Sequence, residues 1–407
     1  MSLKRNLKEA YSPLYFLASL GAGGMTVAFF MYLFYFIPHK GSPIPRFEHL
    51  YAVMTSGGFS LQQLVVVVAL AGIVFFAWMH FRLLAWNISE FNRFRRTKAH
   101  EKLRTTPAEV QLMAIPLTYA MAVNVGFILG ALFVPGLWGV VEYLFPLALV
   151  AFGAIGIHAL KIFTEFYSRV LTEGGFDSVK NNSLSQMLAP FAFSMIGVGF
   201  SAAGAMSHNH VTSAIGLTFA LGFSAIALLL AVIKIVTGFS AMFEHGVNRE
   251  AAVSLWIVIP ILTVVGIALF RVSMGMHHNF GVHLHPAQNA SMFAIIVSIQ
   301  AFFGLLGHAV MKRIGYYETF ISGEGKSPVA YAAICPGVAF FVMGNFFINF
   351  GLVTTGVLPK FSVAYFLFYL PLVYLQAKTI VVLFKLNNKL LKKQPEADAG
   401  ASKPQAA

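Results

Sequence analysis

Long apolar runs alternate with short polar segments along the whole chain, and this pattern decides the fold class. A membrane-spanning helix needs about 20 mostly apolar residues. Ten runs reach that length, at about 13–37, 60–86, 110–133, 136–160, 185–206, 210–236, 250–272, 290–312, 327–350 and 359–386. They predict an all-α integral membrane protein with three parts: a short N-terminal segment at 1–12, a ten-helix domain at 13–388, and a disordered polar tail at 389–407.

Composition supports a membrane location and argues against an enzyme. The apolar set AVILMFWYC makes up 58% of the 407 residues, and charged residues make up 11%, against about 25% charged in soluble domains. So little charge cannot cover a soluble surface. The chain contains no Walker loop, dinucleotide glycine motif, nucleophile elbow or HExxH sequence. We therefore expect neither an enzyme nor a bound cofactor.

The basic residues lie between the apolar runs, where they act as topology determinants and not as a nucleic-acid surface. With ten spans, both termini lie on one side. Four of the 28 Lys and Arg residues lie on the other side, which leaves 24 on the side of the termini. These four are Lys40, Arg46, Arg271 and Lys360. The bias predicts a cell inner (plasma) membrane protein with both termini in the cytoplasm.

The chain carries a repeated pattern that suggests five equivalent helical hairpins. Each even-numbered run ends with a basic residue, and four odd-numbered runs open with a proline followed three residues later by an aromatic residue. The pairs are Pro13 and Phe16, Pro116 and Tyr119, Pro190 and Phe193, and Pro328 and Tyr331. The seventh run departs, with Pro260 further in. Proline also suits helix starts in general, but agreement of both features predicts a fivefold repeat.

Five like-oriented hairpins can close into a quasi-fivefold ring, with the odd helices inside around a central pore. The odd helices are the richer in small and polar residues, including Asn124, Ser194 and Gly197. The competing interpretation is close helix packing, which also selects small residues in membranes. For the whole set we favour a narrow pore lined by the odd helices.

Buried charges are scarce, and their absence narrows the transport mechanism. Only Glu142 among the acidic residues falls within a run, and Lys and Arg are expected to be absent from mid-membrane positions. A proton-coupled antiporter built on buried acids is therefore not expected. Lys161 and Lys234 are predicted to face a cytoplasmic vestibule that attracts anions. Their alternative role is to extend toward lipid phosphates.

The ninth run holds the most distinctive local sequence, with Cys335, Pro336 and Gly337 in succession. Proline within a helix removes a backbone hydrogen bond and kinks the helix. Irregular backbone at membrane depth is tolerated where it lines a cavity, so we expect Cys335 at a constriction. Two roles stay open for this thiol: a small inert hydrophobic group, or a redox-responsive group.

Histidines gather in the predicted outer segments. Imidazoles brought together could bind zinc, copper or nickel, but no carboxylate or thiolate accompanies them, and we expect no metal site. A polar, pH-sensitive rim is the favoured interpretation. The residues concerned are His208, His210, His277, His278, His283 and His285.

Ten spans, cytoplasmic termini, repeated hairpins and prolines in odd helices resemble the tellurite-resistance/dicarboxylate transporter family, which includes the plant slow anion channels. Tyr331 through Pro336 is similar to the family's aromatic–Thr–Phe–Pro stretch, whose phenylalanine plugs the pore. The resemblance places Cys335 at the plug position, so Phe340 or Phe341 would have to supply the missing aromatic. A cysteine at this position also resembles the pattern of a subgroup of the family that has selenocysteine-using members.

The resemblance implies a homotrimer in the lipid bilayer with one anion pathway per subunit. It also implies small-anion partners: chloride, nitrate, oxyanions or small dicarboxylates. The leading hypothesis is therefore an anion channel or permease. The alternative is a membrane redox or sensor protein that acts through Cys335 and the outer histidines.

Overall fold

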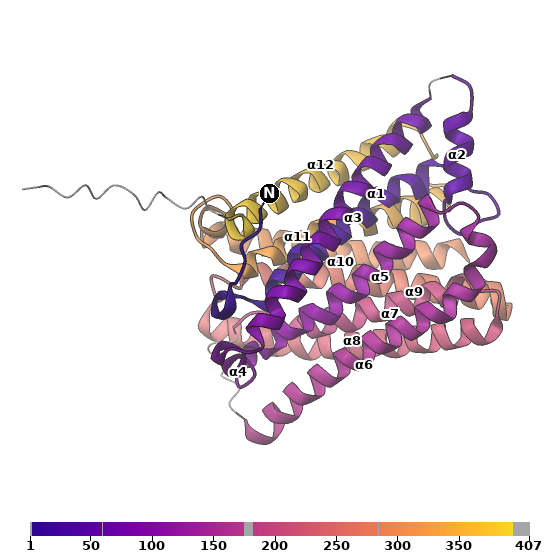
Figure 1. The fold of residues 1–407 in the computed structure, drawn as a ribbon. Coiled ribbons are helices and arrows are strands. Elements are labelled where there is room, and N and C mark those ends of the chain that lie inside the picture. Colours follow the sequence, from indigo (N-terminus) through magenta and orange to yellow (C-terminus); the bar gives the residue numbers. More distant parts are fainter. Residues whose placement is uncertain (1, 59, 175–181, 284, 394–407) are drawn as a thin grey trace, which may run out of the picture.

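The computed structural model describes residues 2–58, 60–174, 182–283 and 285–393, and its regular elements there are helices (Figure 1). Ten of these helical segments are long and apolar enough to cross a membrane. The prediction of an all-α, ten-span membrane protein is therefore confirmed. The spans are Pro13–Phe36, Leu61–Phe94, Pro107–Phe133, Leu137–Glu173, Ser185–Met206, His210–His245, Ala252–Phe280, Pro286–Arg313, Pro328–Val353 and Val363–Leu391.

Each span is built around one main α-helix, labelled as in Figure 1. In chain order these helices are α1 (Phe16–Phe36), α3 (Leu61–Phe94), α5 (Ala114–Phe133), α6 (Val141–Glu173), α7 (Leu188–Met206), α8 (His210–His245), α9 (Val258–Phe280), α10 (Pro286–Arg313), α11 (Ile334–Phe346) and α12 (Val363–Leu386). Two short helices, α2 (Phe47–Thr55) and α4 (Lys98–Leu103), lie in connections. Short 3₁₀ and π segments fill most of the remaining helical residues.

Burial alternates from span to span. In the most apolar stretch of each odd-numbered span, 61–94% of residues are buried, against 22–39% in the even-numbered spans. The odd spans therefore form the interior of the bundle, and the even spans present most of their side chains outward. We refer to the odd-numbered spans as the buried spans.

The buried spans share an irregular start. Each opens with a 3₁₀ segment and then continues as an α-helix: Pro13–Tyr15 before α1, Pro107–Met113 before α5, Ser185–Met187 before α7, Ala252–Ile257 before α9 and Pro328–Ala333 before α11. Short 3₁₀ turns at helix N-termini are common, and the fourth span also opens with one, at Leu137–Val140.

Four of the five buried spans have a proline near this transition. The positions of these prolines change how the spans align with one another, compared with the alignment inferred from sequence. Pro116, Pro190, Pro260 and Pro336 are each the third residue of their α-helix. Pro260 is thus in register with the others, and Pro336, not Pro328, is the equivalent residue in the ninth span. The irregular backbone predicted for the ninth span lies just before Pro336, where the 3₁₀ segment Pro328–Ala333 changes into α11.

The two termini meet at one end of the bundle. Leu3 and Lys392 form an antiparallel bridge, and the Lys4 backbone N–H donates to the Leu391 carbonyl at 2.9 Å. The Glu90 carboxylate accepts from the backbone N–H groups of Asn6 and Leu7 at 3.1 and 2.8 Å. We call this end the terminal face and the opposite end the far face.

The C-terminal boundary also differs from the prediction. A π-helix spans Asn387–Leu391, and the Lys393 backbone N–H donates to Ser2. Residues 389–393 are therefore part of the folded domain, and the predicted disorder of 394–407 lies outside the described residues.

At the terminal face, several even-numbered helices extend beyond the apolar runs predicted from sequence. These extensions contain acidic residues that lay outside the predicted runs. Glu142 is consequently not the only carboxylate in a span. Glu90, Glu165, Glu173 and Glu244 lie in spans 2, 4 and 6, and Glu109 opens span 3. Glu109 is buried and paired with Arg104 and Arg169 at 3.3 and 2.8 Å. These acids lie at the terminal-face ends of their spans.

Helices α7 and α8 pack closely enough for their backbones to touch. A Cβ atom added at Gly216 would lie 2.7 Å from the Gly204 nitrogen and 2.9 Å from the Phe200 carbonyl oxygen. Small residues at such crossings let membrane helices approach closely. Because the obstructing atoms belong to the backbone, no side-chain rotation can make room.

We expect Gly216→Ala to lower the free energy of unfolding by about 2 kcal/mol, because overpacking forces two helices apart. Gly222→Ala on the same helix is the matched control, since a Cβ there meets nothing within 4 Å. It should change stability by no more than about 1 kcal/mol. Thermal unfolding of the detergent-purified protein measures both, and equal losses would contradict the close α7–α8 contact.

Candidate functional site

A cavity of about 180 Å³ lies among the five buried spans. Each of those spans contributes to its wall, together with Phe145, Ala148 and Phe152 of α6 and Ile44 from the connection after α1. Most of the wall is apolar. Among the described residues that border it, Asn124, Thr263 and Arg271 carry polar nitrogen or oxygen groups, and Cys335 adds a thiol.

Arg271 is the charged residue of this wall, and its sequence position predicted it at the outer end of the seventh run. It lies further inside the span than predicted, because α9 continues to Phe280, beyond the predicted end of the run near 272. Arg271 lies nine residues before Phe280, or about 13 Å along the helix axis at 1.5 Å per residue. Arg271 thus lies within the seventh span, whereas Lys and Arg were expected to be absent from mid-membrane positions. Charged residues inside spans usually face a bundle interior or a water-filled cavity and are functional.

The guanidinium of Arg271 is held by α7. Its Nη1 donates to the Val198 carbonyl at 3.1 Å, and the same oxygen accepts from the Ser201 hydroxyl at 2.7 Å. No carboxylate borders the cavity, and no salt bridge of Arg271 occurs within the described part of the chain. One of its five N–H donors is thus anchored by the protein, while the positive charge has no acidic partner there.

Tyr35 of α1 is a further buried residue with a polar group. Its ring packs edge-on against Phe346 and Phe350, with centroids 6.1 and 5.8 Å away. The Tyr35 hydroxyl is buried and has no hydrogen-bond partner among the described residues. A buried hydroxyl without a partner is unfavourable, so this phenol lowers the stability of the bundle.

The remaining polar groups of the wall differ in how many hydrogen bonds they make within the protein. Thr263 donates to the Ala339 carbonyl at 3.0 Å and accepts from Gln300 at 2.7 Å. The Asn124 amide makes a weak contact of 3.9 Å with the Met195 sulfur. Asn124 is therefore the wall residue, besides Arg271, whose donors are largely available to a ligand.

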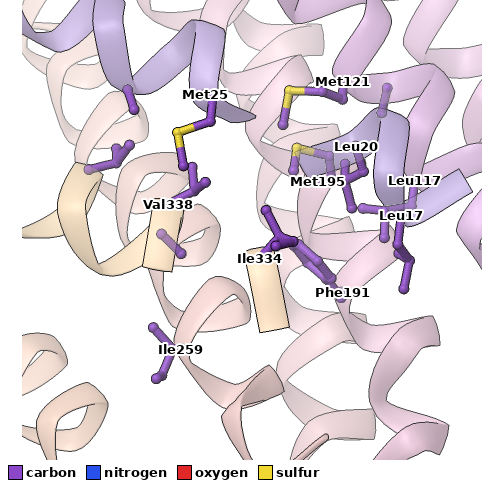
Figure 2. Close-up of a cluster of buried hydrophobic side chains, with 14 of the residues drawn as sticks. Leu17, Leu20, Met25, Leu117, Met121, Phe191, Met195, Ile259, Ile334 and Val338 are labelled. Atoms are coloured by element: carbon purple, nitrogen blue, oxygen red, sulfur yellow. The ribbon is translucent and has the colours of Figure 1, made fainter. Parts of the chain in front are cut away.

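On the terminal side of the cavity, each of the five buried spans carries a buried apolar side chain, and Figure 2 labels one of them in each span. Each of these five side chains is no more than 4% exposed. Phe191 itself borders the cavity. Each of the other four lies one to four residues before the first cavity-bordering residue of its own span, on the side of the terminal face. We call this set the apolar plug: Leu17, Leu117, Phe191, Ile259 and Ile334.

Three residues predicted to line a pore do border the cavity: Cys335, Asn124 and Pro260. Cys335 lies at the start of α11, beside Ile334 of the apolar plug. The structure thus brings the predicted thiol, amide and proline to one chamber. The other predicted pore residues lie elsewhere.

The predicted aromatic residues pack within the protein and do not border the cavity. Phe16 packs against Tyr119, with ring centroids 6.2 Å apart. Phe193 packs against Phe163 and Phe223. The Tyr331 hydroxyl donates to Asn387 at 2.9 Å.

The proposed replacements for a pore plug are also displaced. Phe341 is fully buried against Tyr32, with ring centroids 5.5 Å apart, and Phe340 does not border the cavity. Of the small predicted residues, Ser194 donates to the Phe191 carbonyl at 2.8 Å. Gly197 faces α8, Gly337 faces Thr379 of α12, and Pro336 is buried in the first turn of α11. For these glycines, close helix packing is the role that the structure supports.

The two lysines predicted for a vestibule lie on outer helices. Lys161 is exposed on α6, and the Lys234 ammonium lies 5.2 Å from the Tyr167 ring centroid. Neither borders the cavity. The cation of the site is therefore Arg271, not these lysines.

The structure brings together two of the outer histidines, His208 and His278, with ring centroids 4.8 Å apart. His210 packs on Phe280, His277 bonds the Val282 carbonyl, His285 caps α10, and His283 is exposed. Within the described ranges, no three His, Cys, Asp or Glu residues form a group suited to a metal ion.

Two further histidines lie near Ile44 at the far face. Burial lowers the pKa of His39, and so does its neighbour Lys360. Burial also lowers the pKa of His49, helped by Arg46. Because both shifts favour the neutral imidazole, these side chains add no positive charge to this rim at neutral pH.

No family model matches the chain, and no curated protein matches its sequence. The site therefore has to be interpreted from its own geometry and chemistry.

We expect Tyr35→Phe to leave the free energy of unfolding unchanged or to raise it by up to about 1 kcal/mol, because the substitution removes an unpaired buried hydroxyl. The unfolding temperature should then stay the same or rise. Tyr331→Phe is the control, since that hydroxyl is bonded to Asn387, and it should lower stability by about 1 kcal/mol. Thermal unfolding of both variants tests this. Equal destabilisation would show that the Tyr35 hydroxyl has a partner such as bound water.

Proposed function

We propose that this protein is a channel or uniporter for small anions, whose path runs through the cavity among the buried spans. In this proposal the spans form five hairpins in a quasi-fivefold arrangement, with the odd helices around a central pore. The alternation of burial and the shared 3₁₀ starts support that arrangement.

One observation carries the proposal: the charged side chain on the cavity wall is a cation, and no carboxylate borders the cavity in the described part of the chain. An apolar chamber strengthens the interaction of Arg271 with any ion inside it, because the local dielectric is low. Anions are attracted and cations are repelled. Positively charged rings or residues in this position are typical of anion-selective pores.

The apolar plug gives the proposed path a closed state. Hydrophobic constrictions block ion passage by excluding water. The plug lies on the terminal side of the cavity, so an anion that reached Arg271 from the far face would stop there. Movement of a few apolar side chains would then open the route.

The same proposal includes the membrane in which the protein lies, the side on which its termini lie and its assembly. The basic residues near the terminal face favour a cytoplasmic location for both termini in the cell inner membrane, and a homotrimer stays the proposed assembly. The alternative redox or sensor function has less support. Cys335 lies beside the apolar plug, whereas the outer histidines lie toward the far face, beyond Arg271.

Purified protein in proteoliposomes, with potassium and valinomycin to set the voltage, tests the proposal. We expect voltage-driven flux of at least one small anion among chloride, bromide, nitrate and hydrogen sulfite, well above protein-free vesicles. Absence of flux for all of them would overturn the proposed function.

Opening the apolar plug should increase the flux. Phe191→Ala is expected to raise it about tenfold, which corresponds to a barrier lower by about 1.4 kcal/mol. The change also lowers stability by about 3–5 kcal/mol, so assembly must be checked by gel filtration.

Phe341→Ala is the matched control, since Phe341 is equally buried but lies away from the cavity. It should lose similar stability without gaining flux. An equal rise in both variants would indicate general loosening of the bundle and would contradict the assignment of the plug.

A further inference from the structure

Resting on the proposed function, the geometry points to a specific oxyanion site: we propose that the Arg271 guanidinium and the Asn124 amide together bind a small monovalent oxyanion. Candidates of this class are nitrate, hydrogen carbonate and hydrogen sulfite. Both side chains border the same cavity, from α9 and α5.

Their contacts with α7 place the two groups at adjacent levels. Arg271 bonds the carbonyl of Val198, and Asn124 touches the sulfur of Met195. These α7 residues are three positions apart, or about 4.5 Å along the axis. A ligand of a few atoms beside α7 can therefore contact both donors.

The shape of the guanidinium selects the ligand geometry. Its planar donor fork matches two oxygens of one anion, with two parallel N–H···O bonds. The bond from Nη1 to Val198 fixes the orientation of this fork, and the Asn124 amide can donate to a third oxygen. A halide is a sphere and gains the charge attraction without this directional match.

The charge of the wall selects the ligand charge. One cation and no anion border the cavity among the described residues, so a monovalent anion gives a neutral site. A dianion such as sulfate would leave one charge uncompensated in an apolar chamber, which is strongly unfavourable. The site thus separates monovalent oxyanions from halides by shape and from dianions by charge.

Separate proteoliposome assays with nitrate, bromide and sulfate test this assignment. Bromide is chosen because its hydration resembles that of nitrate. The wild type should carry nitrate faster than bromide and nearly exclude sulfate. Arg271→Lys keeps the charge but loses the fork, so it should lower the nitrate-to-bromide ratio about fivefold while bromide flux stays within about twofold of the wild type.

Three further variants complete the design. Arg271→Gln should lower both fluxes, and Asn124→Leu should lower the ratio about threefold, the loss of one neutral hydrogen bond. Arg313→Lys is the control at an exposed position at the end of α10, and it should change neither quantity. In detergent, nitrate should raise the unfolding temperature of the wild type more than that of Arg271→Lys.

The outcomes separate the two proposals. If the wild type carries none of the anions, the proposed function fails. If it carries anions but the nitrate-to-bromide ratio is the same in Arg271→Lys, or sulfate passes as fast as nitrate, the oxyanion site is overturned and the proposed function stands. Should Arg271→Lys fail to assemble, an unchanged ratio in Asn124→Leu overturns the site.

Discussion

The structure depends on how an apolar bundle accommodates one guanidinium. Burying an ionised group away from water is very unfavourable unless the charge is paired and hydrogen-bonded. Arg271 meets the hydrogen-bonding part of this requirement through the Val198 carbonyl of the neighbouring helix, but among the described residues no carboxylate meets the pairing part. The chamber around it is therefore a place where a mobile anion is more stable than in an otherwise similar apolar cavity.

The even spans make such a chamber possible. They present most of their side chains outward, and this shields the buried spans from lipid. Helix α7 is central because its backbone both contacts α8 through Gly204 and Gly216 and holds Arg271 through Val198. Helix α7 thus both packs against α8 and holds the Arg271 guanidinium, so a change in its position would move the cation.

The sequence was sufficient for the number of spans, because a run of about 20 apolar residues has few alternatives to a membrane helix. It failed at helix ends. Arg271 was placed at the outer end of a span because the run was ended near 272, although Val272, Met274 and Met276 continue an apolar pattern up to Phe280. Pro328 was aligned with the helix-start prolines because its aromatic follows at the right spacing. The 3₁₀ segment that displaces the true equivalent, Pro336, has no comparable sequence pattern. Which residues face a cavity could not be predicted either, since glycines and serines serve packing and pores alike.

The bridge between Leu3 and Lys392 has a mechanical consequence. It fastens the first span to the tenth, and the contact of Tyr32 with Gln376 at 2.6 Å repeats that fastening within the membrane. A bundle clasped in this way resists splaying at the seam where the chain begins and ends. In the proposed pathway, any widening would then arise from side-chain rotation or from slight turning of helices at their 3₁₀ starts, without large domain movements.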